Sequence, residues 1–147
     1  MRLVFFLVFL FVANTVVAQS NHVNKQSGYG AAGYDLISYF DSDPIKGKEK
    51  YTVVFENITY KFSSSEHAKQ FKESPTKYLP QYGGWCAYAM ASEGEKVKVN
   101  PKTFELRDGK LYLFYNAYFS NTFEDWLEEG PEQLILKADK NWQGIVK

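Results

Sequence analysis

Two side chains of this sequence carry soft donor atoms that could bind a transition metal or perform catalysis, His67 and Cys86. The chain of 147 residues contains one cysteine and two histidines. One thiolate and one imidazole suit Cu(I) or Zn(II) if the fold brings them together. Two other interpretations of Cys86 stay open: a buried thiol that only packs, or a catalytic Cys–His pair that needs an orienting third group. His67 could also lie on the surface of its helix.

Two further residues are weaker candidates for metal binding. Cleavage after Gln19 would give a mature chain beginning Ser20-Asn21-His22, whose amine, backbone amides and imidazole form a square-planar nitrogen site for Cu(II). Cleavage after Ala18 is preferred, because a small residue usually precedes the cut. Asp35 could bind a metal, but an aspartate after Gly33-Tyr34 more often caps a turn.

The sequence lacks the common short signatures of enzymes. It contains no Gly-x-Ser-x-Gly, no phosphate-binding glycine loop, no His-Glu-x-x-His and no Cys-x-x-Cys. The formal net charge is zero and the lysines are dispersed, whereas nucleic-acid binding generally needs a concentrated cationic surface. We therefore expect a protein that is not an enzyme and does not bind nucleic acid. The aromatic content of 18% predicts a core and rim rich in tyrosine and phenylalanine.

Residues 1–18 have the pattern of a secretory signal peptide. Arg2 precedes the apolar run Leu3–Val12, and small residues end at Ala18. The apolar run is about half of the roughly 20 residues that a membrane span needs. We expect export to a periplasm or to the outside of the cell, with no membrane attachment after cleavage. Residues 19–30, polar and rich in glycine, predict a flexible arm, and residues 31–147 form the predicted domain.

The candidate residues must be positioned by two predicted hairpins and the helices around them. Strands at 51–55 and 58–62 are joined by Glu56-Asn57, and strands at 103–107 and 110–115 by Asp108-Gly109. A helix follows from residue 64, and Ser63 with Glu66 matches a capping box that places His67 one turn later. Residues 33–40, dense in β-forming side chains, begin the fold.

The second half of the sequence is predominantly helical by its apolar pattern. Residues 85–91 are apolar throughout and predict a buried segment, favouring a helix, before a charged loop at 92–102. The spacing of Phe119, Phe123, Trp126 and Leu127 predicts one apolar helix face, and Pro131 begins a last helix. The fold class is therefore α+β: a small antiparallel sheet from two β-hairpins packed against several helices.

Taken together, several motifs of this chain resemble the YHS domain family, in particular its larger exported members. The resemblance covers about residues 31–143. It rests on Gly33-Tyr34-Asp35, Tyr39-Phe40, the run 59–64 (Thr-Tyr-Lys-Phe-Ser-Ser), Phe71, Pro75, Tyr78, the run 80–88 (Pro-Gln-Tyr-Gly-Gly-Trp-Cys-Ala-Tyr), Asp108 to Leu113, and Ala138-Asp139 through Trp142.

The resemblance implies heavy-metal handling, because short members of the family accompany copper-transporting ATPases and carry cysteines. In this chain the positions of that thiol pair fall on Ser63 and His67, and the upstream thiol falls on Ser38. A serine hydroxyl is a poor ligand for a soft metal, so the thiolate site does not carry over. The first hypothesis is an exported, non-enzymatic protein that binds copper or zinc through His67 and Cys86. The alternative is an aromatic-lined module for a small ligand or a protein partner, in which the family's metal site has been lost.

Overall fold

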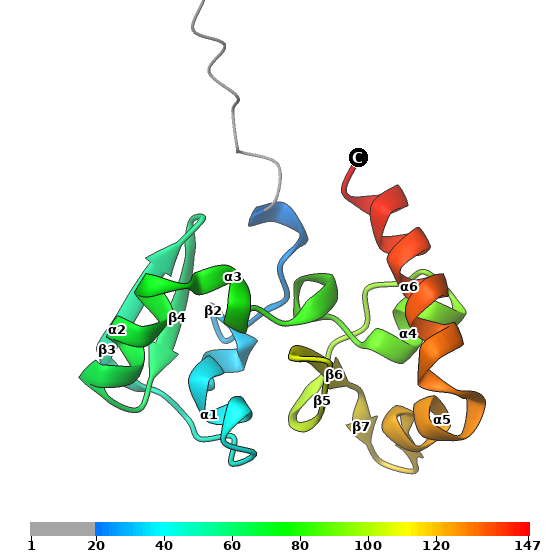
Figure 1. Ribbon diagram of the computed structural model, residues 1–147, viewed down its shortest axis with the longest axis horizontal. Coiled ribbons are helices and arrows are strands. Elements are labelled where there is room, and N and C mark those ends of the chain that lie inside the picture. Colours follow the sequence, from blue (N-terminus) through cyan, green and yellow to red (C-terminus); the bar gives the residue numbers. More distant parts are fainter. Residues whose placement is uncertain (1–19) are drawn as a thin grey trace, which may run out of the picture.

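A computed structural model describes residues 20–147 of the protein. These residues form two lobes joined by a short connection (Figure 1). The predicted signal peptide lies outside the described residues. The N-terminal lobe contains β1 (Lys25–Gln26), β2 (Tyr29–Gly30), α1 (Leu36–Phe40), β3 (Lys48–Phe55), β4 (Ile58–Phe62), α2 (Ser65–Glu73) and α3 (Pro75–Tyr78). The C-terminal lobe contains α4 (Ala87–Ser92), β5 (Asn100–Arg107), β6 (Lys110–Phe114), β7 (Asn116–Ala117), β8 (Ser120–Asn121), α5 (Thr122–Glu129) and α6 (Pro131–Ile145). Within residues 20–147, no helix is both long and apolar enough to cross a membrane.

The α+β class is confirmed, and so are both predicted hairpins. In the β3–β4 turn Glu56 and Asn57 have φ of 48° and 62°, and in the β5–β6 turn Asp108 and Gly109 have φ of 51° and 72°. Positive φ at both central residues is the geometry that two-residue hairpins favour. The hairpins form separate two-stranded antiparallel sheets within the described chain. They meet through side chains in a shared core, and their edges do not pair.

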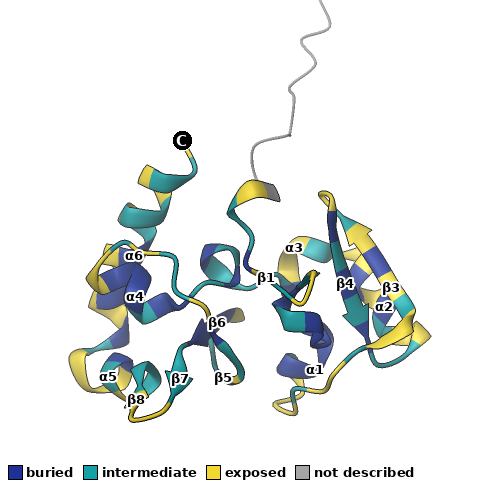
Figure 2. Ribbon diagram, turned by 180° about the vertical axis from the view of Figure 1, so that it is seen from behind, coloured by how far each residue is buried: buried dark blue, intermediate teal, exposed yellow. Residues whose placement is uncertain are grey.

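Strand β6 divides two hydrophobic cores. Leu111 and Leu113 point into the core that both hairpins share, which also holds the buried face of β4 and Phe71 of α2. Tyr112 and Phe114 point the opposite way, into a core formed with α4, α5 and α6. Because successive side chains of a strand alternate between its faces, one strand serves both cores. The two cores therefore lie on opposite faces of β6, whose buried part is visible in Figure 2.

Residues 20–30, expected as a flexible arm, instead pack on the connection between the lobes. The Asn24 backbone N–H donates to the Gly83 carbonyl at 2.8 Å, and its side-chain amide donates to the Gly84 carbonyl at 3.0 Å. A Cβ on Gly83 would lie 2.6 Å from the His22 carbonyl oxygen, so only glycine allows this close approach. Long-range backbone contacts thus order a segment whose composition suggests mobility.

Three local predictions differ from the structure. Residues 36–40, for all their β-forming side chains, are helix α1, because the Asp35 carboxylate caps it by accepting from Ile37 N–H. The expected loop at 92–102 ends early, since β5 begins at Asn100 with an irregular register. Phe119 lies outside α5, fully exposed in the turn between β7 and β8, and Leu127 is also exposed.

Candidate functional site

The Asp35 carboxylate joins three elements at the corner between β4 and α2. It accepts from Ile37 N–H of α1 at 2.9 Å, and from Ser63 N–H at 2.8 Å and Ser63 Oγ–H at 2.6 Å. It also accepts from His67 Nδ1–H of α2 at 2.7 Å, which places the imidazole proton on Nδ1. Asp35 is fully buried. Because every one of these donors is held in place, the corner is a closed hydrogen-bond cluster.

The predicted capping box is wrong in its cap residue. Helix α2 is capped by Ser64, whose Oγ accepts from His67 N–H at 3.1 Å. The Ser63 N–H, which a capping box would pair with Glu66, donates to Asp35 instead, and so does the Ser63 hydroxyl. The partner of Ser63 is Asp35, which lies 28 residues earlier in the chain. A local sequence pattern does not include such a distant residue.

The three positions matched to the cysteines of the short YHS proteins all surround Asp35. Ser63 and His67 bind its carboxylate, and the Ser38 hydroxyl donates to its backbone carbonyl at 2.6 Å. The side chains at these positions are two hydroxyls and an imidazole that are grouped around Asp35. Only His67 Nε2 is left to point elsewhere. Such a corner has the donor set of a structural cluster rather than of a soft-metal site.

Cys86 lies in a different setting from His67. It is fully buried before α4, where its Sγ lies 3.3 Å from Thr122 Oγ1 and accepts from Tyr115 N–H at 3.4 Å. The hydrogen bonds of His67 go to Ser63, Ser64 and Asp35, and Figure 1 shows α2 and α4 in different lobes. Among the described residues, no group of three or more His, Cys, Asp or Glu side chains could hold a metal ion. The residues present do not fit one copper or zinc centre shared by this thiol and this imidazole.

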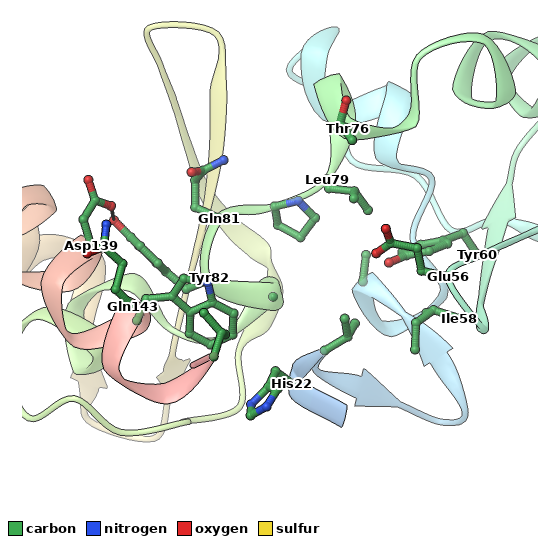
Figure 3. A pocket seen from close by; sticks show the side chains of 16 residues that line it. His22, Glu56, Ile58, Tyr60, Thr76, Leu79, Gln81, Tyr82, Asp139 and Gln143 are labelled. Carbon is green, nitrogen blue, oxygen red and sulfur yellow. Dashed lines mark hydrogen bonds between the residues drawn. The ribbon is translucent and has the colours of Figure 1, made fainter. Parts of the chain in front are cut away.

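A cleft of about 330 Å³ lies between the two lobes (Figure 3). This volume falls within the range typical of small-molecule pockets. The β3–β4 hairpin forms one wall, α6 the opposite wall, and the connection Leu79–Gly83 the floor between them. The residues that line the cleft are His22, Val23, Ala31, Glu56, Ile58, Tyr60, Thr76, Leu79, Pro80, Gln81, Tyr82, Gly83, Asp139, Trp142, Gln143 and Val146.

Tyr82 occupies a strained position on the C-terminal side of the cleft. Its backbone is left-handed, with φ of 55° and ψ of 38°, which is uncommon for a bulky side chain. Its phenol donates to Asp139 Oδ1 at 2.9 Å, and its ring contacts Trp142 edge to face at 6.3 Å between centroids. Burial, and then the hydrogen bond to Asp139, raise the pKa of the phenol well above its usual value. Backbone strain of this kind concentrates at functional sites.

His22 closes the lower edge of the cleft as drawn in Figure 3. Its ring meets Trp142 edge to face at 6.2 Å, and its Nδ1 lies 2.9 Å from Lys96 Nζ. Its backbone carbonyl accepts from Trp85 Nε1–H at 2.6 Å. In the described chain His22 therefore packs against Trp142 and Lys96 beside the connection between the lobes.

Sequence reasoning did not find the cleft. Its wall residues come from segments that lie far apart in the chain, and two of them, Ile58 and Tyr60, were predicted only to belong to a strand. One signal was available: the run Pro80-Gln81-Tyr82-Gly83-Gly84 places two glycines beside an aromatic residue, which predicts an unusual backbone there.

Comparison of the chain with protein-family models, with curated proteins and with solved structures gave no match. The resemblance to the YHS family therefore stays a prediction.

Proposed function

We propose that this protein binds a small, largely apolar ligand in the cleft between its two lobes. The observation that carries the proposal is the strained Tyr82, whose ring and hydrogen bond to Asp139 are held on the wall of a 330 Å³ cleft. The strained backbone of an aromatic residue lowers the stability of the fold. We infer that the strain is kept because it holds the Tyr82 ring on a binding surface. Both lobes contribute walls, so the pocket exists only in the folded, assembled domain.

The proposal is one of binding, without catalysis. The lining residues offer apolar surface and a few hydrogen-bonding groups, the usual composition of a ligand pocket. The sequence contains none of the enzyme motifs sought above. We further propose that the protein acts after export, as its first 18 residues suggest.

An NMR titration with indole as a neutral planar probe tests the proposal. We expect the amide signals of Tyr82 and Trp142 to shift saturably at millimolar indole, a concentration range suited to a weak fragment. Gln143→Trp fills the cleft from an exposed position of α6 and should abolish the shifts. The matched control is Gln133→Trp, which adds the same side chain to an exposed position of the same helix outside the cleft. Shifts absent from the cleft, or unaffected by Gln143→Trp, would refute the proposal.

A second proposal, transition-metal binding, keeps one observation in its favour. The bond from His67 Nδ1 to Asp35 orients the ring and leaves Nε2 as the nitrogen available to a metal, a pattern common around metal-bound histidines. Titration with Cu(I), Cu(II) and Zn(II) tests it on the native protein and on His67→Ala and Cys86→Ala. Stoichiometric binding that His67→Ala abolishes would support a site at Nε2, and absence of binding to the native protein would refute it. Binding that Cys86→Ala leaves intact would assign the thiol to packing alone.

A further inference from the structure

The charges on the walls of the cleft are of one sign. Glu56 lies at the turn of the β3–β4 hairpin and Asp139 lies on α6, and Figure 3 shows the two carboxylates on opposite walls. Within the described chain, the lining includes no lysine and no arginine. One ammonium group comes near from outside, Lys96 Nζ, which contacts the His22 ring and does not line the cleft. A bound anion would face two carboxylates with no countercharge, and a bound cation would be attracted by both.

The carboxylates have room to accept from a ligand. Asp139 Oδ1 accepts from the Tyr82 phenol, and in the described residues Oδ2 accepts no hydrogen bond. Glu56 is exposed and lies close enough to Tyr60 that its charge adds to burial in raising the pKa of that phenol. Each wall therefore offers at least one free carboxylate oxygen.

Aromatic faces complete the arrangement. Trp142 is only partly buried and stands against Tyr82 at an interplanar angle of 68°. A cation over the face of tryptophan is attracted by the ring's quadrupole, more strongly than over tyrosine or phenylalanine. The remaining walls, including Ile58, Leu79 and Val146, are apolar and suit a hydrocarbon body.

From these three observations we propose that the cleft selects cationic amphiphiles: a primary or quaternary ammonium group attached to a small apolar body. The proposal rests on the proposed function, because it assigns the ligand class of the same cleft. The ammonium group lies against Trp142 and near one of the two carboxylates, with the other adding to the attraction across the cleft, and the apolar body lies against the apolar walls.

Three probes that share one apolar body test the ligand class: 2-phenylethylamine, 2-phenylethanol and phenylacetate, which are cationic, neutral and anionic at pH 7. Affinities are measured from the NMR shifts of the Trp142 indole N–H. We expect the amine to bind about tenfold more tightly than the alcohol, and phenylacetate more weakly than either. The advantage of the amine should shrink at high salt, because the carboxylates are partly exposed.

Charge-removing variants identify the groups responsible. Glu56→Gln and Asp139→Asn keep the side-chain shape, and the asparagine can still accept from Tyr82. Each should weaken the amine about threefold and the alcohol by less, because the alcohol carries no charge. Glu128→Gln, at an exposed position of α5 outside the cleft, is the control and should change neither.

The possible outcomes separate the two proposals. Equal affinity for amine and alcohol, or tighter binding of phenylacetate, would overturn the cationic class and leave the cleft as a binding site. Failure of all three probes and of indole to shift the cleft signals would overturn both proposals. Amine binding that neither charge-removing variant weakens would also overturn the assignment of these carboxylates.

Discussion

Replacing Asp35 with alanine should be among the most destabilising single substitutions in this protein. Its fully buried carboxylate accepts four hydrogen bonds, two from backbone amides and two from side chains. The side chains of Ser63 and His67 are partly exposed and can find water, but the two backbone donors would lose a charged acceptor. An orphaned buried donor costs about 1–3 kcal/mol. Two such donors give an expected loss of about 4 kcal/mol, close to the cost of breaking a buried pair.

Graded variants separate the contributions within the Asp35 cluster. Asp35→Asn keeps one accepting oxygen but turns an amide N–H₂ toward a donor, so we expect a loss of about 2 kcal/mol. Ser63→Ala removes one side-chain donor and keeps the backbone bond, for a loss of about 1 kcal/mol. Asp41→Ala, at an exposed position just after α1, should change stability by no more than about 0.5 kcal/mol.

Urea unfolding followed by tryptophan fluorescence measures these differences, with the free energy taken by linear extrapolation. The expected order of loss is Asp35→Ala, then Asp35→Asn, then Ser63→Ala, then the control. A loss below about 1 kcal/mol for Asp35→Ala would refute the reasoning, because it would mean that the buried amides need no carboxylate.

Three further predictions concern close packing, the thiol and high pH. Gly30→Ala places a Cβ 2.3 Å from the Tyr60 ring and should lower stability by about 2 kcal/mol, whereas Gly144→Ala meets nothing within 4 Å and should stabilise α6 slightly, both by urea unfolding. Buried Cys86 should react with a disulfide reagent only in denaturant, and stoichiometric reaction of the native protein would contradict its burial. Burial and the hydrogen bond to Asp139 raise the pKa of Tyr82 above its ordinary value of 10.0. Its contribution to stability is therefore complete below pH 10.0 and is lost as the pH rises through the raised pKa. As the pH is raised, the absorbance of ionised tyrosine at 295 nm should therefore rise together with cooperative unfolding. Ionisation of every tyrosine in a protein that stays folded would contradict this prediction.

Local patterns predicted the elements that depend on local chemistry. Asp108-Gly109 and Glu56-Asn57 form the expected turns, because two-residue hairpin loops demand residues that tolerate positive φ. Pro131 begins α6 as expected, since proline suits the first position of a helix. The burial of residues 85–91, before and within α4, was also predicted, because a segment of apolar side chains is stabilised by leaving water.

The remaining features depend on residues far apart in sequence. Asp35 decides both the start of α1 and the role of Ser63, and the distance between them in the chain hides that competition. The spacing of Phe119 predicted that it belongs to the helix of Trp126, but Phe119 lies in the β7–β8 hairpin, which ends just before α5. The cleft was missed for the same reason as the cluster: Tyr60, Tyr82 and Trp142 line one cleft only after both lobes have packed.

The most direct test of the central claim, that the functional surface is the cleft between the lobes, is a crystal structure of the protein soaked with 2-phenylethylamine. We predict electron density for the amine in the cleft, with its nitrogen against Trp142 and within hydrogen-bonding distance of Glu56 or Asp139. Ordered amine anywhere else with an empty cleft, or a cleft filled by the protein's own side chains, would contradict the claim.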